Sequence, residues 1–301
     1  MPPPGCPPRR AGLGKLIAGS GRNPARLVAA GSQGAALPSF DAPGMFKARF
    51  ILARRSIASP NVIGILPGTD PALADQAIIL SAHLDGYGHG EPVDGDALYN
   101  GTLDNAAYVA LLIRLAERRG GQGFRRPIVF AAFAGEEKGL LGSRHYAARP
   151  TWPLARTAAN INLDQLRPIF PLELLTVHAL NDTSLGDDVR AIASAMGVAV
   201  QADPEPERNL LRRSDHWPLI EKGIPATGFV FGYRPGSRSE RIYRQWYRTG
   251  YHKPQDDLRQ LIDWKAAADF NTFFYRLVER VADQPEKPAW KPGSALRAQL
   301  R

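Results

Sequence analysis

Hydrophobic and polar positions follow two different patterns along the middle of the chain. Short apolar runs bounded by Gly and Pro predict strands, and the most apolar of them are suited to burial on both faces of a sheet. Longer stretches carry apolar residues at helical spacing, and the first of these ends at Gly120 and Gly121. We expect strands at 46–57, 61–68, 76–86, 126–135, 159–165, 172–180 and 224–233, and helices at 104–121, 185–197 and 266–283.

This alternation of strand and helix predicts the fold class. It indicates an α/β protein, a three-layer sandwich around a mostly parallel mixed central sheet. Residues 1–45 are rich in Gly, Pro, Ala and Arg and predict a poorly packed leader, with one short helix around Asn23–Ala30. Residues 46–283 would form the catalytic domain, and residues 284–301 a Pro-rich tail that lies on the surface or frays.

Composition and charge exclude several classes of function. The chain has 301 residues, 44% of them hydrophobic, so it can bury a sizeable core. Its single cysteine, Cys6, leaves no internal disulfide and no Cys-based zinc site. The net charge is +9, but the arginines are scattered without a basic stripe, so we expect no nucleic-acid partner. No apolar run reaches the roughly 20 residues of a membrane span, so none is expected.

Polar residues interrupt the apolar pattern where the predicted strands end. In open α/β sheets, functional groups gather just beyond the carboxyl ends of the strands. Any one of these residues could be a helix cap or a hydrogen-bonded surface group, and Asp104 or Asn105 suits the N-cap of the first long helix. If these residues converge on the rim formed by the carboxyl ends of the strands, however, so many charges would be unfavourable there unless cations neutralised them. Imidazole and carboxylate ligands without thiolate suit zinc. The residues are His83, Asp85, Asp104, Glu136, Glu137, Asp164 and His252.

The adjacent carboxylates Glu136 and Glu137 raise a separate question, because two like charges repel each other. On an extended segment, adjacent side chains point to opposite sides. One could therefore bind metal while the other carries a proton.

Six strings resemble one family in their order and spacing. They are SAHLDG, GTLDNAAYVALLIRLA, FAGEEKGLLGS, NINLDQ, RRSDHWPLIEKGIPA and GYHKPQDDL. Together they resemble the M28 family of zinc metallopeptidases, from about Pro60 to Asp283. The resemblance implies a zinc-peptidase (phosphorylase/hydrolase-like) fold, two zinc ions per chain, a peptide substrate and hydrolysis of peptide bonds, with an aminopeptidase favoured.

The resemblance also implies roles for individual residues. It makes His83 and Glu137 ligands of one metal, Asp164 and His252 ligands of the other, and Asp104 the bridge between them.

Glu136 would be the general acid and base, and Asp85 the carboxylate that orients His83. Arg213 and Tyr251 resemble residues that contact the substrate or the oxyanion, although a surface cation and a packed ring explain them equally well.

Other functions remain open from the sequence. Glutaminyl cyclases share the fold but are cyclising transferases with one zinc, and a carboxypeptidase or dipeptidase is also possible on it. A receptor-like domain would have lost ligands. The segment GKLIAGSGRNPARLVAAGSQG resembles the one that follows a protease-associated domain. We therefore expect a longer natural N-terminus and, with it, a secreted or periplasmic protein; location and oligomeric state are otherwise open.

Side-chain preference depends on the walls of the pocket. We expect contributions from loops 86–99 and 231–247, with residues 203–209 beside the pocket. His89, His145 and His178 are not expected to bind metal, and His216 could shape the pocket. An apolar pocket is expected from the aromatic residues Trp217, Phe231, Tyr243, Trp246 and Tyr247.

Overall fold

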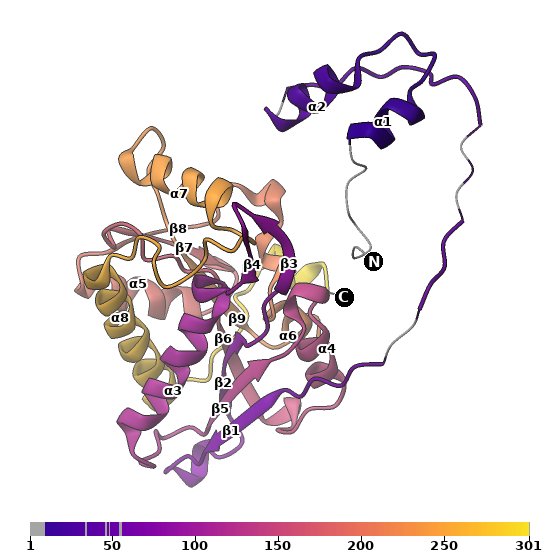
Figure 1. The fold of residues 1–301 in the computed structure, drawn as a ribbon. Helices are drawn as coiled ribbons and strands as arrows, with labels where there is room; N and C mark the ends of the chain where they lie inside the picture. Colours follow the sequence, from indigo (N-terminus) through magenta and orange to yellow (C-terminus); the bar gives the residue numbers. More distant parts are fainter. Residues whose placement is uncertain (1–9, 34, 46, 48, 54–55, 301) are drawn as a thin grey trace. The chain divides into compact units, whose positions relative to one another are not determined.

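Seven strands form the central sheet, in the order β1-β5-β2-β6-β9-β7-β8. β2 pairs in parallel with β5 and β6, β6 with β9, and β7 with β8, whereas β1 and β7 run antiparallel to β5 and β9. The predicted mixed, mostly parallel sheet is therefore confirmed (Figure 1). The strands are β1 (Val62–Leu66), β2 (Ala77–His83), β5 (Ile128–Phe133), β6 (Thr157–Leu163), β7 (Leu174–His178), β8 (Ala199–Gln201) and β9 (Ala226–Phe231).

Helices cover both faces of this sheet, because its buried strands present apolar side chains in both directions. Ile78 and Leu80 of β2 belong to the core that also holds Leu112 and Phe273, on the α3 and α8 side. Ile79 belongs to the core on the α4 and α6 side. The helices are α3 (Ala107–Arg119), α4 (Leu141–Ala148), α5 (Leu185–Ala195), α6 (Trp217–Ile220), α7 (Arg238–Thr249), α8 (Trp264–Asp283) and α9 (Ala295–Ala298).

The computed structural model describes residues 10–33, 35–45, 47, 49–53 and 56–300. The chain divides into two compact units, Met1–Ile57 and Ala58–Arg301, and the sheet belongs to the second. The first unit holds α1 (Arg10–Leu16) and α2 (Pro24–Ser32). Asn23 caps α2, its Oδ1 accepting the backbone N–H of Ala25 at 2.9 Å, which confirms the predicted short helix.

Two expectations were wrong at the level of elements. The strand predicted at 46–57 is not formed in the described residues 49–53, where Phe50, Ile51 and Leu52 are at least 80% exposed. An apolar run forms a strand only when another strand pairs with it.

Of the two alternatives for the tail, the described residues follow the first: they lie on the surface and are held there, because Leu296 is buried and the Trp290 indole N–H donates to the Gly223 carbonyl at 2.8 Å.

The segment 231–247, expected as a loop, contains α7. Its N-cap is Ser237, whose Oγ accepts the Glu240 N–H at 3.2 Å, while the Glu240 carboxylate accepts the Gly236 N–H at 2.7 Å. The sequence Ser-x-x-Glu is the capping-box signal that could have predicted it. A second small sheet, β3 (Gly88–Val93) paired with β4 (Asp96–Tyr99), was also missed in the segment 86–99.

Candidate metal centre and active site

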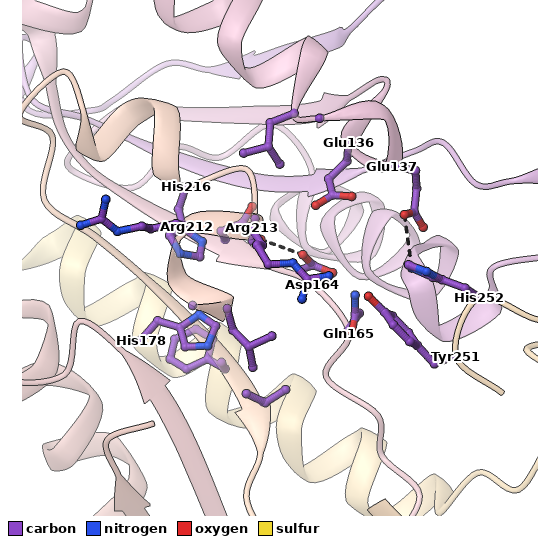
Figure 2. A pocket seen from close by; sticks show the side chains of 18 of the residues that line it. Glu136, Glu137, Asp164, Gln165, His178, Arg212, Arg213, His216, Tyr251 and His252 are labelled. Atoms are coloured by element: carbon purple, nitrogen blue, oxygen red, sulfur yellow. Dashed lines mark hydrogen bonds and ion pairs between the residues drawn. The ribbon is translucent and has the colours of Figure 1, made fainter. Parts of the chain in front are cut away.

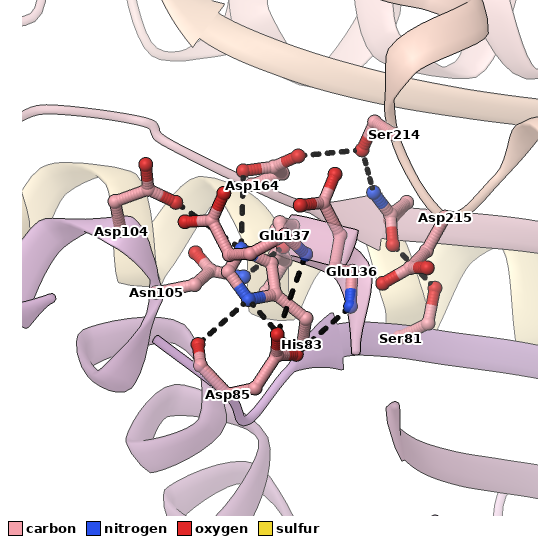
Figure 3. Close-up of polar contacts among 12 residues, drawn as sticks. Ser81, His83, Asp85, Asp104, Asn105, Glu136, Glu137, Asp164, Ser214 and Asp215 are labelled. Carbon is pink, nitrogen blue, oxygen red and sulfur yellow. Dashed lines mark hydrogen bonds and ion pairs between the residues drawn. The ribbon is translucent and has the colours of Figure 1, made fainter. Parts of the chain in front are cut away.

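The predicted polar residues converge at the carboxyl ends of neighbouring strands (Figure 3). His83 is the last residue of β2 and is 1% exposed. Asp164 directly follows β6, and Glu136 and Glu137 lie in a short turn after β5. Two further residues come from outside the sheet, Asp104 from the segment that precedes α3 and His252 from the loop that follows α7.

Asp104 stands between the two histidines and offers one oxygen to each. Its Oδ1 lies 3.1 Å from His83 Nε2, and its Oδ2 lies 3.2 Å from His252 Nε2. Asp164 Oδ1 lies 3.7 Å from the same nitrogen of His83, and Glu137 Oε2 lies 3.2 Å from that of His252. Two groups that could hold a metal therefore share Asp104: His83 with Asp164, and Glu137 with His252.

This grouping differs from the division implied by the family resemblance, which placed Glu137 with His83 and Asp164 with His252. The carboxylates of Glu136 and Glu137 do approach His83 as a third candidate group. The ion-pair contact of Glu137 among the described residues, however, is with His252. Which ligands share a metal depends on how the loops approach in space, which the order of residues along the chain does not contain.

Several of these atoms lack hydrogen bonds although they are buried. Asp104 Oδ2, Glu137 Oε1, Asp164 Oδ1 and His252 Nε2 have no hydrogen-bond partner within the described part of the chain. Buried polar atoms normally have partners, and leaving one without costs about 1–3 kcal/mol. A cation bound among these atoms would remove that cost, so their chemistry fits a divalent ion such as zinc.

The protonation of the histidines gives the same indication. Burial opposes charge on His83, but Asp104, Asp164 and Asp85 outweigh it and raise its pKa well above the usual value. Burial likewise opposes charge on His252, but Asp104 and Glu137 raise its pKa to about 9. The carboxylates thus hold positive charge at both imidazoles, and a metal ion would take the place of those protons.

Asp104 and Asn105 do not cap the helix as the sequence suggested. Both have non-helical backbone angles, and the Asn105 side chain donates instead to the Leu163 carbonyl at 2.9 Å. Asp104 can therefore present both of its oxygens to the histidines.

Glu136 and Glu137 lie in a single 3₁₀ turn, Glu136–Lys138, and not on the extended segment that we expected. The carboxylate of Asp85 accepts the backbone N–H groups of Glu136 at 3.0 Å and Glu137 at 3.3 Å. It therefore fixes the turn that carries both side chains. The close partner of His83 Nδ1 is the backbone carbonyl of Asp85 at 3.0 Å, whereas the carboxylate is 3.7 Å away. The backbone carbonyl of Asp85, more than its carboxylate, is therefore placed to orient the His83 ring.

The Glu136 carboxyl group favours its protonated form. Burial, and then the charge of Asp164, raises the pKa of Glu136 to about 10, although His83 opposes the shift. A cation at the neighbouring carboxylates would lower this pKa again. A carboxyl group whose proton affinity responds to bound charge is suited to carry a proton during a reaction.

Three contacts that the sequence did not reveal hold the centre in place. Asp256 is buried, and its carboxylate accepts the backbone N–H groups of Leu103 at 2.9 Å and Asp104 at 3.0 Å. The GYHKPQDDL string contains Asp256, but nothing in its pattern distinguishes it from the adjacent Asp257.

The hydroxyl of Ser214 donates to Asp164 Oδ2 at 2.7 Å, which leaves Oδ1 facing His83. The hydroxyl of Tyr87 lies 3.1 Å from His252 Nδ1, on the ring edge opposite Asp104. Such outer partners orient metal ligands.

A pocket with a volume of about 330 Å³ opens beside this centre (Figure 2). Arg213 and Tyr251 both line it, and the Tyr251 ring stacks on His252 with 3.6 Å between ring centroids. Burial, and then Asp104, raises the pKa of Tyr251 to about 12, so its hydroxyl stays protonated at neutral pH. Both residues lie where the sequence expected contacts with substrate.

The expectation that five aromatic residues line the pocket is largely wrong. Tyr247 lines the pocket, and Tyr87 contributes from the segment 86–99. The other four aromatic residues are buried in the hydrophobic cores instead: Trp217, Phe231, Tyr243 and Trp246. Aromatic content alone did not separate core positions from pocket positions.

Comparison with known proteins places this geometry in a family. The chain is 32% identical over 181 residues to the alkaline phosphatase isozyme conversion protein of Escherichia coli, covering 54% of this chain and 51% of that protein. Its fold is similar to that of BSAP, a zinc aminopeptidase from Bacillus subtilis, with a TM-score of 0.57, 23% identity and coverage of 75% of this chain and 51% of that one. It is also similar to that of the Porphyromonas gingivalis glutaminyl cyclase, with a TM-score of 0.50, 20% identity and coverage of 73% and 76%.

The two structural likenesses show the fold alone. The chain spans about half the length of the E. coli relative and a smaller share of other curated relatives. The family model for peptidase family M28 matches residues 61–278, which include all seven residues of the predicted rim. The chain belongs to peptidase family M28.

Proposed function

We propose that this protein is a zinc-dependent exopeptidase that removes residues from the amino end of peptides. The observation that carries the proposal is the position of Asp104, whose two oxygens face two histidines that each have a second carboxylate beside them. Two cations sharing one carboxylate are the arrangement used by co-catalytic aminopeptidases and phosphatases.

The ligands follow from the two groups. His83, Asp104 and Asp164 would hold one zinc ion, and Asp104, Glu137 and His252 would hold the other. When bound, zinc acts as a Lewis acid on the scissile carbonyl and lowers the pKa of water.

The chain itself supplies the movement of protons. Glu136 makes no ion pair among the described residues, and bound cations would lower its raised pKa, so that its carboxylate could accept a proton from the attacking water. As the bond between the carbonyl carbon and the leaving nitrogen breaks, the same carboxyl group returns the proton to the amine. Arg213 and the protonated Tyr251 line the same pocket, and the Tyr251 hydroxyl can donate to the oxygen on which negative charge develops.

The choice of an aminopeptidase rests on relatives. BSAP is named as a zinc aminopeptidase, and a B. subtilis relative 26% identical over 207 residues is named as an aminopeptidase. A carboxypeptidase or dipeptidase would use the same centre on a different end of the peptide.

Metal analysis combined with a peptide library tests the proposal. We expect about two zinc ions per chain, release of amino-terminal residues and loss of activity with a chelator, restored by zinc. His145→Ala removes an exposed histidine outside the centre and should keep both metal and activity. Full activity in an exhaustively chelated sample would exclude a metallopeptidase.

The glutaminyl cyclase fold likeness makes cyclisation the second candidate. Incubating the protein with peptides that begin with Gln separates the two reactions. Release of free Gln supports hydrolysis, and formation of pyroglutamate with loss of ammonia would instead assign the protein as a cyclase.

A further inference from the structure

The pocket continues beyond the metal centre to a polar floor. His178 at the end of β7 and His216 just before α6 lie there (Figure 2). Gly228 of β9 lies close to both rings. A Cβ at Gly228 would lie 3.3 Å from His178 Nδ1 and 3.4 Å from His216 Cε1, so the absence of a side chain keeps this end open. The floor is deep, because His178 is 8% and His216 1% exposed.

Neither histidine is fully satisfied by the protein. Neither ring nitrogen of His178 has a hydrogen-bond partner among the described residues, and the His216 ring has only a weak contact with the backbone of Leu211, although the two ring centroids are 5.5 Å apart. Burial lowers the pKa of both, so they are neutral at physiological pH, and each offers one N–H donor and one acceptor. Unpaired buried polar groups are costly, so a polar group of a ligand fits this floor better than an apolar one.

The charged residues that line the pocket indicate which kind of polar ligand group would bind there. The pocket is lined by four arginines, whereas its three acidic residues, Glu136, Glu137 and Asp164, all belong to the metal centre. Positive charge therefore dominates on the side away from the metal.

The four arginines differ in whether they already form ion pairs or hydrogen bonds with other residues of the chain. Arg144 lies 3.5 Å from Glu221, and Arg212 donates to Gln299 at 2.7 Å. Arg213 forms neither a hydrogen bond nor an ion pair with any residue that the structure describes, and its side chain lies between the histidine pair and Asp164 in Figure 2. It is therefore the cation that is free to meet a ligand.

The fourth arginine, Arg167, is fully buried between the rings of Tyr243 and Tyr247, each 4.6 Å from its guanidinium carbon. Its Nε and Nη1 have no hydrogen-bond partner in the described chain. It adds fixed positive charge beneath the pocket, where screening by water is weak.

We propose that this pocket binds a carboxylate of the substrate, with Arg213 as the counter-ion and His178 and His216 as hydrogen-bond donors. The inference rests on the proposed peptidase function and names its substrate class. The carboxylate belongs either to the side chain of an amino-terminal Glu or Asp or to the α-carboxyl group of a very short peptide. A basic side chain would meet Arg213 and Arg167, and an apolar one would leave the histidines unpaired.

Pairs of substrates that differ only in charge test the proposal. Glutamyl- and glutaminyl-aminomethylcoumarin have nearly the same shape, as do Leu-Leu and Leu-Leu amide. With the zinc-loaded protein, we expect kcat/KM to favour the charged member of at least one pair by about tenfold or more, the scale of a charged hydrogen bond, and the pair that responds identifies the source of the carboxylate. A preference below about threefold in both pairs overturns the proposal.

Binding separates this proposal from the peptidase function. If the pocket binds an acidic side chain, glutamic acid α-amide should raise the Tm of the zinc-loaded protein more than glutaminamide does. If the pocket binds the α-carboxylate, Leu-Leu should raise this Tm more than Leu-Leu amide does. Selective binding without any hydrolysis would contradict the peptidase function and leave the carboxylate pocket supported. Hydrolysis without selectivity would do the reverse.

Arg213→Gln should reduce the charge preference at least fivefold without changing Tm, because Arg213 is exposed. Arg149→Gln is the matched control: Arg149 is also exposed, at the end of α4, and does not line the pocket, so the preference should persist. Equal slowing of charged and neutral substrates in Arg213→Gln would show that Arg213 acts on the reacting bond and not on selectivity.

Discussion

At the scale of single residues, Glu136 and Glu137 are neighbours with different surroundings. Glu137 lies 3.2 Å from His252, whereas Glu136 makes no ion pair in the described part of the chain, and burial raises its pKa to about 10. Glu136→Gln should keep zinc and fold but lower kcat by about 10²-fold or more, the usual scale of general acid and base catalysis. Glu137→Gln should lose zinc as well, because it removes a charged ligand. Measuring the zinc content and kcat of both variants tests these roles. If both variants lost zinc equally, or if Glu136→Gln kept a near-normal kcat, the roles assigned to Glu136 and Glu137 would be wrong.

The sequence pointed to the residues at strand ends, such as His83 and Asp164, because polar side chains there interrupt the apolar pattern; Asp104 and His252 lie outside the sheet, and the family resemblance supplied their roles as ligands. It could not give the grouping of His83 with Asp164, which depends on a distance between two strand ends. It also missed Asp256, since a buried carboxylate that accepts backbone N–H groups looks in sequence like any loop Asp. The floor histidines His178 and His216 were noticed, but their unpaired nitrogens are visible only in three dimensions.

At the scale of elements, one carboxylate joins the loop that carries His252 to the segment that carries Asp104. Asp256 accepts the N–H groups of Leu103 and Asp104 with its two oxygens. Asp256→Asn replaces one acceptor with a donor that faces an N–H group, so stability should fall by about 1–3 kcal/mol and zinc affinity by about 10–100-fold. Denaturant unfolding and zinc titration measure both. Asp257→Asn is the control, because the Asp257 carboxylate contacts Arg259 instead; zinc affinity falling equally in both variants would contradict this role for Asp256.

A second element is the segment 203–209, which the sequence placed beside the pocket. Glu205 connects it to α7 and to the end of the sheet, since its carboxylate accepts from Arg244 at 2.7 Å, Tyr233 at 2.8 Å and Arg208 at 3.0 Å. Although burial opposes it, these donors lower the pKa of Glu205. The folded pKa lies below the unfolded one, so the stabilisation is complete above the unfolded pKa of about 4.5 and is lost as the pH falls through the lower folded pKa.

Glu205→Gln should therefore cost about 1–3 kcal/mol at pH 7 and flatten the loss of stability in acid. Unfolding free energies measured from pH 7 down to pH 3 test this. Glu207→Gln changes an exposed carboxylate in the same segment and should leave the curve unchanged. A parallel pH profile for parent and Glu205→Gln would show that Glu205 contributes nothing to acid sensitivity.

Prediction from sequence succeeded best for elements that are buried on both sides. The strands at 76–86 and 126–135 were predicted because continuous apolar runs can be satisfied only inside a sheet. The run at 46–57 looked similar, but Phe50 and Ile51 are exposed, which shows that an apolar pattern does not supply a pairing partner. α7 was missed because the aromatic residues of the segment 231–247 were assigned to a pocket loop, although Tyr243 and Trp246 are spaced as on one face of a helix and Ser237 supplies a cap.

At the scale of the whole molecule, the matched family region and the sheet lie in the unit Ala58–Arg301. We propose that this unit is the catalytic domain. Among the described residues, no helix is long and apolar enough to span a membrane. The proposed metal ligands come from two strand ends, the turn after β5, the segment before α3 and the loop after α7, so metal binding would tie together segments from residue 83 to residue 252.

Because these ligands are so far apart along the chain, zinc should stabilise the fold as a whole. A ligand that binds only the folded state at a thousand times its Kd adds about 4 kcal/mol, which corresponds to a rise in Tm of about 10 °C for a domain of this size. Asp104 offers an oxygen to both groups, so Asp104→Asn should lose both ions and most of this rise. Asp164 belongs to one group, so Asp164→Asn should keep about one ion and part of the rise. Calorimetry with and without zinc, together with zinc analysis, distinguishes these outcomes. If Asp104→Asn bound as much zinc and gained as much in Tm as the parent protein, the metal would lie elsewhere, and the shared-carboxylate centre would have to be abandoned.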